Sequence, residues 1–140
     1  MIICYHGCSQ NVIETLVSGK IDVSVGGGEL GQGFYSSFNL WVAKQWTWYK
    51  YHSKTVLQIE ILDEHFFTLD VRFLAIDEAI KYRKSIKYLG ETRSYLFNKD
   101  MIWSAIVGDE MVGKQEEQIK WESKKAEQLL NSDLVKRSQI

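Results

Sequence analysis

Apolar and polar residues alternate with a period of two from Thr55 to Leu62. This period predicts a strand with Leu57, Ile59 and Ile61 on a buried face and polar side chains on the other. A shorter β-prone run extends from Ile2 to Tyr5. The chain therefore contributes at least two strands to a sheet that is covered on one face.

Turn and capping residues place the next elements. Ser9 is suited to cap a helix that runs through about Val17 and closes at Gly19. The apolar content of residues 22–25 predicts a second short strand, and residues 34–37 are expected to be extended. The start of the chain thus predicts the order strand, helix, strand, strand.

A helix capped by Asn39 is expected to follow. Leu40, Ala43, Trp46 and Tyr49 recur in it at helical spacing, which predicts that they face the core. For the aromatic residues around this helix, packing is the preferred interpretation and a base-stacking platform is the alternative. These residues are Trp41, Trp46, Trp48, Tyr49 and Tyr51.

Helical periodicity returns in residues 70–97 and is broken at Gly90, which predicts two helices against the sheet. An apolar strand is expected over residues 101–107, ending at Gly108 and Asp109.

The last part of the chain predicts one strand, one helix and a tail. A polar connection over residues 110–117 leads to a strand at 118–122, a helix at 124–130 and a frayed tail at 132–140. Strands and helices are interspersed without a regular β-α-β repeat. We therefore expect a compact mixed α+β domain rather than a doubly wound parallel sheet.

Composition limits the class of protein. The 140 residues, 45% of them hydrophobic, suffice for one domain with its own core, residues 1–140. The formal net charge of -1 gives no overall attraction for nucleic acid or an anionic membrane. No apolar stretch is long enough to cross a bilayer, and no leader pattern is evident, so we expect a cytoplasmic protein without a membrane partner.

His6, at the end of the first strand, is a candidate binding residue. Cys4, His6 and Cys8 resemble part of a zinc site, but a further ligand at recognisable spacing is missing, so we predict no metal and buried free thiols. Cys8 and His6 are too close in sequence to suggest a catalytic pair, and no Gly-x-Ser-x-Gly pattern occurs.

Half of the ten glycines cluster just before Phe34 and Tyr35, which is typical of a loop that approaches a ligand closely, with an ordinary surface turn as the alternative. They are Gly26, Gly27, Gly28, Gly31 and Gly33. The run lacks the Lys-Ser/Thr ending of a phosphate-binding P-loop. It formally matches a dinucleotide fingerprint, but the following helix begins only near Asn39, which disfavours a Rossmann fold.

The combination of Tyr5-His6-Gly7, a helix, the segment 31–37 and a helix containing Ala43 and Trp46 is more specific. It resembles the first two signature regions of ADP-ribosyltransferases, in the branch with His, Tyr and Glu or Gln that includes diphtheria-type toxins and poly(ADP-ribose) polymerases. More narrowly, it resembles a family of short bacterial proteins in that superfamily.

The second half adds to this resemblance by order and spacing. Residues 106–109 read Ile-Val-Gly-Asp, residues 118–123 form the final strand motif, and Ala126, Leu129 and Leu130 match its Ala-x-x-Leu-Leu helix. The resemblance covers most of the chain and implies an ADP-ribosyltransferase-like fold.

The resemblance also implies roles in binding NAD as co-substrate. His6 would bond a ribose hydroxyl, the Gly7 backbone would pair with the nicotinamide amide, and Tyr35 would stack on the nicotinamide ring. The other residues of the same binding segment are Gly33, Phe34, Ser36 and Ser37, with one of the two serines touching ligand.

Gln118 matches the third signature position, where many relatives have a catalytic glutamate. Glutamine can orient a ribose hydroxyl but carries no charge to stabilise the ribose cation. Glu117 and Glu122 are the candidates for an assisting catalytic carboxylate, and Glu122 shares the strand parity of Gln118. The alternative for both is a solvated surface charge.

The function implied is that of an NAD-dependent mono-ADP-ribosyltransferase, a glycosyltransferase acting on a macromolecule, protein or nucleic acid. Small members of this kind resemble toxins of toxin-antitoxin or phage-conflict systems, which implies an antitoxin protein as partner. The alternatives are a catalytically inactive module that binds NAD or a nucleotide, and a protein-interaction module whose aromatic residues contact a partner.

Overall fold

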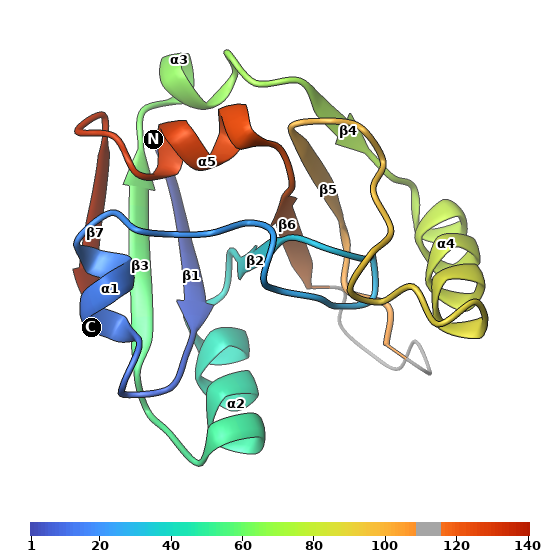
Figure 1. Ribbon diagram of the computed structural model, residues 1–140, viewed down its shortest axis with the longest axis horizontal. Helices are drawn as coiled ribbons and strands as arrows, with labels where there is room; N and C mark the ends of the chain where they lie inside the picture. Colours follow the sequence, from blue (N-terminus) through green and yellow to red (C-terminus); the bar gives the residue numbers. More distant parts are fainter. Residues whose placement is uncertain (109–115) are drawn as a thin grey trace.

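The computed structural model describes residues 1–108 and 116–140. Within them, seven strands form one mixed sheet in the order β4-β5-β6-β2-β1-β3-β7, with five helices around it (Figure 1). The predicted α+β class is confirmed. No helix in the described ranges combines the length and apolar character needed to span a bilayer.

The strands are β1 Ile2–Gly7, β2 Phe34–Ser37, β3 Val56–Ile61, β4 Val71–Phe73, β5 Met101–Ala105, β6 Glu117–Trp121 and β7 Val135–Gln139. The helices are α1 Ile13–Val17, α2 Leu40–Tyr51, α3 Asp63–Phe66, α4 Ile76–Tyr88 and α5 Lys124–Leu130.

Neighbouring strands are antiparallel except β4 and β5, which are parallel. Strand β1 pairs with β3 along its whole length, from Ile2 opposite Ile61 to Gly7 opposite Val56. On its other side, β1 pairs with β2 only where Tyr5 lies opposite Ser37. The sheet is therefore continuous across β1 and β2 but joined there by a short ladder.

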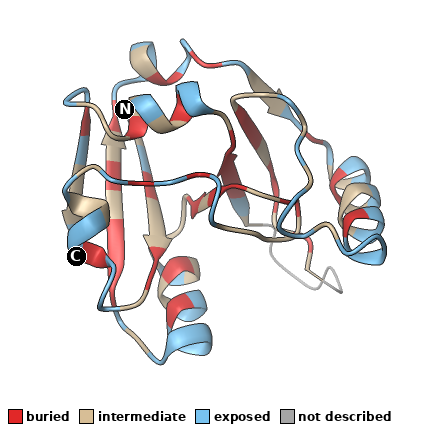
Figure 2. Cartoon of the chain, viewed as in Figure 1, coloured by how far each residue is buried: buried red, intermediate tan, exposed pale blue. Residues whose placement is uncertain are grey.

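Two hydrophobic clusters lie on opposite faces of the sheet. Met101 belongs to the larger cluster, with Phe66 and Trp121, whereas the next residue of β5, Ile102, belongs to the smaller one with Leu30. Because successive strand residues point to opposite faces, the two clusters are separated by the sheet. Figure 2 shows the buried residues concentrated along the strands and on the inner sides of the helices.

Several predicted elements differ from the structure near the ends of helices and strands. Helix α1 begins at Ile13 after Val12, without the expected cap from Ser9. Residues 22–25 form turns, not a strand. The backbone N–H of Val23 instead donates to the Glu127 side chain on α5. The hydrogen-bonding capacity of the Val23 N–H is thus satisfied by a side chain distant in the sequence, and no neighbouring strand is needed.

The region predicted as two helices contains β4 and the single helix α4. Gly90, with φ of 68°, follows the end of α4 as a left-handed glycine often does. The predicted interruption of the helix at Gly90 is therefore confirmed. The helix expected after it is absent: residues 92–94 form a turn, and residues 91 and 95–97 are neither helix nor strand. The polar connection 110–117 and Asp109 lie largely outside the described residues.

The expected frayed tail is wrong. Residues Val135–Gln139 form β7, which pairs with β3 from Val135 opposite Ile61 to Gln139 opposite Leu57. Strand β3 would otherwise present an unpaired edge. The C-terminal segment is therefore an ordered edge strand of the sheet.

Helix α2 has the predicted cap, since the Asn39 side chain accepts a hydrogen bond from the Trp41 N–H. Its predicted packing face is confirmed at Ala43 but wrong at Trp46 and Tyr49. Ala43 and Thr47 are buried, whereas Trp46 and Tyr49 are exposed. A Cβ on Gly7 would lie 2.8 Å from Thr47 Cβ, so α2 packs directly on the backbone of β1 through small side chains. The rings point outward because this contact leaves no room for them.

Candidate functional site

The candidate site lies where β1 and β2 separate beyond Tyr5 and Ser37. The Cys8 N–H donates to Thr55, on the side of β3. Because backbone groups of successive strand residues point in alternate directions, those of Gly7 point toward β2. The opening between the strands is thus lined by backbone groups of Gly7.

The His6 side chain connects β1 to β2 beside this opening. Its Nδ1 lies 2.5 Å from the backbone oxygen of Tyr35, and its ring stacks on Phe34 with centroids 4.1 Å apart. Burial lowers the pKa of His6 to about 4, although the bond to Tyr35 opposes this shift and Lys50 adds to it. His6 is therefore neutral at pH 7, with its Nδ1–H donating to the Tyr35 carbonyl oxygen.

Tyr35 lies on the opposite face of the sheet from the His6 side chain. Its hydroxyl donates to Gly31 O at 2.6 Å and accepts from the Leu30 N–H at 3.1 Å. A Cβ on Gly28 would lie 2.7 to 3.0 Å from atoms of the ring. Burial raises the pKa of Tyr35, so the phenol stays protonated. The glycine loop therefore covers one face of the ring that is predicted to stack on nicotinamide.

Gln118 shares the face of Tyr35. It lies directly opposite Ser37 across the β2–β6 ladder, where Tyr35 pairs with Lys120. The Ser37 hydroxyl donates to Asn39 O at 2.8 Å. The structure thus brings Tyr35, Ser37 and Gln118 together on one face of two neighbouring strands.

Glu29, which sequence reasoning did not select, completes this group. Its Oε1 accepts hydrogen bonds from Gln118 Nε2 at 2.7 Å and the Val107 N–H at 3.0 Å. Its Oε2 accepts from the Gly108 N–H at 3.0 Å and Arg83 Nε at 3.2 Å. These donors fix a carboxylate from the glycine loop beside the amide of β6.

A signal for Glu29 was present in the sequence. It stands inside the glycine run, and no other acidic residue occurs between Asp22 and Glu60. A carboxylate in a segment otherwise built from small and apolar residues favours a specific partner. What the sequence could not show is that the partner is Gln118, 89 positions away.

Glu117 and Glu122 have different environments. Glu117 is exposed and accepts a hydrogen bond from Trp103 Nε1 at 2.9 Å. Glu122 is buried 2.6 Å from Lys120 Nζ, and its carboxylate also accepts the N–H groups of Phe97 and Lys99. The surface-charge interpretation is therefore wrong for Glu122, whose carboxylate is held by structural partners.

The remaining predicted binding residues divide between the two faces. Phe34 and Ser36 are buried on the face of His6, and the Ser36 hydroxyl accepts from Trp121 Nε1 at 2.9 Å. Gly33 lies against the Lys120 stem, which a Cβ would meet at 2.6 Å. The side chains of His6, Phe34 and Ser36 thus do not converge with those of Tyr35 and Gln118.

The prediction of buried free thiols is confirmed. Cys4 and Cys8 are both buried and unpaired in disulfides. Burial raises the pKa of Cys4 to about 12 and that of Cys8 to about 11, which makes both poor nucleophiles at pH 7. Among residues 1–108 and 116–140, no three His, Cys, Asp or Glu side chains are placed to hold a metal ion.

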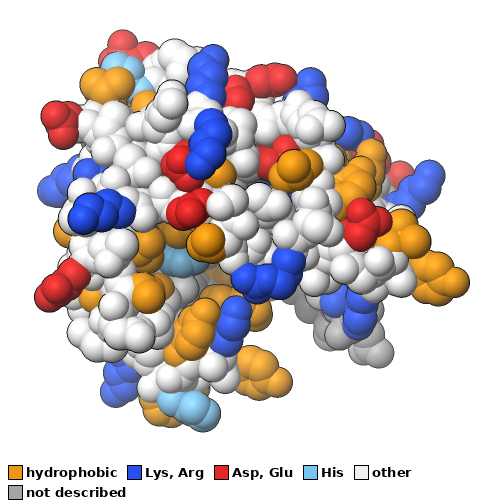
Figure 3. Space-filling view, in the orientation of Figure 1, with side chains coloured by type: hydrophobic (Ala, Val, Ile, Leu, Met, Phe, Trp, Pro, Cys, Tyr) orange, Lys and Arg blue, Asp and Glu red, His pale blue; other side chains and the backbone are white. Residues whose placement is uncertain are grey.

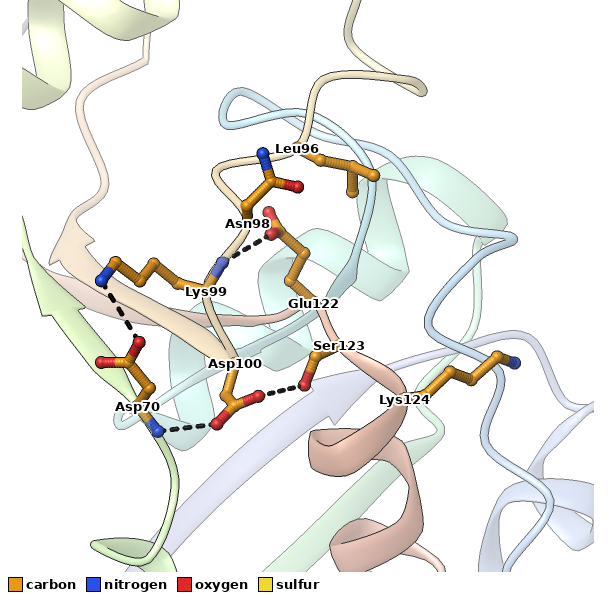
Figure 4. A pocket seen from close by; sticks show the side chains of 8 residues that line it. All are labelled: Asp70, Leu96, Asn98, Lys99, Asp100, Glu122, Ser123 and Lys124. Atoms are coloured by element: carbon orange, nitrogen blue, oxygen red, sulfur yellow. Dashed lines mark hydrogen bonds and ion pairs between the residues drawn. The ribbon is translucent and has the colours of Figure 1, made fainter.

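A surface cavity of about 380 Å³ lies at the other end of β6, near Glu122 (Figure 4). Its carboxylates already have partners within the protein. Asp100 accepts from the Asp70 N–H and the Ser123 hydroxyl, and Asp70 accepts from Lys99 Nζ. This cavity therefore presents no convergent set of groups for a ligand.

Comparison with known proteins adds no identification. No family model matches the chain, and searches of curated proteins and of solved structures give no match.

Proposed function

We propose that this protein is an NAD-dependent mono-ADP-ribosyltransferase with an ADP-ribosyltransferase-like fold. The observation that carries the proposal is the 2.7 Å hydrogen bond between Gln118 Nε2 and Glu29 Oε1. The third signature position offers only an amide, and Glu29 brings a carboxylate to that amide from another segment. Glu29 would thus supply the charge that the resemblance requires, without a glutamate at position 118.

The surroundings also suit the nicotinamide half of NAD. The backbone of Gly7 points into the opening between β1 and β2, where it can pair with a carboxamide, and Tyr35 offers an aromatic ring. Since Gly28 covers one face of that ring, stacking there requires the loop to move away from Tyr35. The proposal therefore includes an opening of the glycine loop when NAD binds.

Transfer breaks the bond between ribose C1′ and the nicotinamide nitrogen. Nicotinamide leaves as a neutral molecule with the bonding electrons, and positive charge develops on the ribose. A nucleophile of the acceptor then bonds to C1′ and loses its proton. Glu29 would stabilise the developing charge, while the Gln118 amide, oriented by Glu29, would hold a ribose hydroxyl.

A second candidate function is an NAD or nucleotide-binding module without transfer activity. The hydrogen bonds of the Tyr35 hydroxyl and the four donors on Glu29 favour it, because each would have to rearrange or be shared during catalysis.

The biological setting follows from the resemblance alone. We propose a cytoplasmic toxin of a toxin-antitoxin or phage-conflict system, with an antitoxin protein as partner and a macromolecular acceptor. Co-expression with a neighbouring gene product that relieves toxicity would test this part separately.

The catalytic proposal is tested by incubating the protein with NAD labelled in its adenylate half and a cell lysate, with nicotinamide release followed in parallel. We expect label on a macromolecule. Replacing Glu29 by Gln should lower the rate about 100-fold or more, in the range found for loss of one charge-stabilising group. Tyr35→Ala should abolish labelling, whereas Glu14→Gln, on the exposed surface of α1, serves as a control with unchanged rate.

Three outcomes separate the candidates. NAD binding without label or nicotinamide release would support the inactive module. No binding of NAD at high micromolar concentration would overturn both NAD-dependent functions. Full activity of Glu29→Gln would contradict the assigned role of Glu29 even if transfer occurs.

A further inference from the structure

Helix α2 exposes an unusual number of large rings. Trp41 is 68% exposed, Trp46 and Trp48 are each 53% exposed, Tyr49 is 84% exposed and Tyr51 is 44% exposed. The helix packs on β1 through Ala43 and Thr47 instead, so none of these rings is needed for that contact. Exposed apolar groups gathered on one element mark an interaction surface.

The surface of α2 is also basic. No acidic residue occurs between Glu29 and Glu60, although the whole chain has a net charge of -1. Lys44 and Lys50 belong to α2, and Lys54 follows it. Glu116 is bonded to Asn39 at the N-terminal end of the helix. Figure 3 shows hydrophobic and basic side chains together over α2, at the lower edge of the molecule.

Rings and ammonium groups alternate at short distance. Lys44 Nζ lies 4.8 Å from the centre of the Trp41 ring, and Lys50 Nζ lies 5.3 Å from the Trp46 and Tyr51 rings. Each pair can present a flat π surface to a base and a cation to the adjacent phosphate. This combination matches a single-stranded nucleic acid, whose bases are free to stack.

From these contacts we propose that α2 binds single-stranded nucleic acid. Apolar and polar residues of α2 are distributed around the helix and are not segregated to opposite faces, so α2 lacks the amphipathic character by which a helix enters a lipid surface. A duplex keeps its bases stacked and offers no faces to the rings. A single strand therefore accounts for both features of α2, because its bases can stack on the exposed rings and its phosphates can pair with the lysines.

The position of α2 connects this surface to the candidate site. Its cap Asn39 follows β2 by two residues, and the helix packs on Gly7. A nucleic acid bound to α2 would therefore be held one helix away from the end of β1 that borders the opening. If the proposed transfer is correct, this nucleic acid is the acceptor of ADP-ribose, and only this last step rests on the proposed function.

The test measures fluorescence anisotropy of labelled single-stranded DNA and RNA of about twelve nucleotides, within the usual site size. NAD is omitted, so the result is independent of transfer. Trp41→Ala and Tyr49→Ala should each weaken binding about tenfold, the effect of losing one stacked base. Tyr88→Ala on α4, where the ring is 90% exposed, is the matched control and should not change affinity.

The charges are tested by salt dependence. Lys50→Gln should reduce the slope of log K against log salt by about 0.7, as expected for loss of one phosphate contact on a single strand. Circular dichroism and melting temperature of all variants should equal those of the unchanged protein, since the replaced side chains are exposed.

The proposal is overturned if neither DNA nor RNA strands bind, if a duplex binds as tightly as its single strand, or if Tyr88→Ala weakens binding as much as Tyr49→Ala. Binding only to vesicles of phosphatidylglycerol and phosphatidylcholine, or only self-association, also overturns it. Binding of single-stranded DNA or RNA, with a preference for either, supports the proposal and shows which nucleic acid α2 prefers. Transfer of label from NAD without any binding of single-stranded nucleic acid would contradict this inference but not the proposed function.

Discussion

At the scale of single residues, His6 is the most informative side chain. Its imidazole is neutral because burial costs more than the bond to Tyr35 recovers, and its pKa falls to about 4 from an ordinary 6.5. The unfolded chain therefore binds a proton at higher pH than the folded chain does. Stability contributed by His6 is complete above pH 6.5 and is lost as the pH falls toward 4.

This loss can be isolated by comparing the protein with His6→Gln. Urea unfolding should show that the free-energy difference between the two proteins changes by at most about 3 kcal/mol between pH 6.5 and 4. The unchanged protein should lose more stability than the variant as the pH falls. If the unfolding free energies of the two proteins change equally with pH across this interval, burial of a neutral His6 does not contribute to the pH dependence of stability.

At the scale of elements, the contact between α2 and β1 depends on the absence of a side chain at Gly7. A Cβ there meets the Ala43 carbonyl oxygen and lies 2.8 Å from Thr47 Cβ, so Gly7→Ala must displace the helix. We expect a loss of about 3 kcal/mol in the free energy of unfolding, as for overpacking of a tight contact. Chemical denaturation of the purified variant gives this value.

Gly90→Ala provides the comparison. Gly90 has φ of 68° but nothing within 4 Å of an added Cβ, so only backbone strain of about 1 kcal/mol is expected. Equal losses in the two variants would mean that close packing of α2 contributes little.

At the scale of the whole molecule, the pair of Lys120 and Glu122 ties distant segments together. Lys120 Nζ donates to Leu30 O, Tyr95 O and Glu122, and burial lowers the pKa of Lys120 against the opposing effect of Glu122. The pair thereby joins the glycine loop, the segment after α4 and the end of β6. Lys120→Met should cost about 3–5 kcal/mol, because the Glu122 carboxylate stays buried without its cation.

The double variant Lys120→Met with Glu122→Gln should recover part of this loss, since no buried charge is then left unpaired. Melting temperature and urea midpoint of the single and double variants measure the difference. A double variant less stable than Lys120→Met alone would contradict this account and indicate that the hydrogen bonds of Glu122 to Phe97 and Lys99 dominate.

The sequence by itself determined the elements whose stabilising contacts are local. The alternation in β3, the Asn39 cap of α2 and the helix predicted over residues 124–130 are visible within a few residues, and each predicted element is present. Only the tertiary structure decided which residues meet. It gave β7 a partner in β3, turned the rings of α2 outward because Gly7 admits only small side chains, and placed Glu29 on Gln118. These outcomes depend on contacts between segments far apart in the chain, and local periodicity carries no information about such distances.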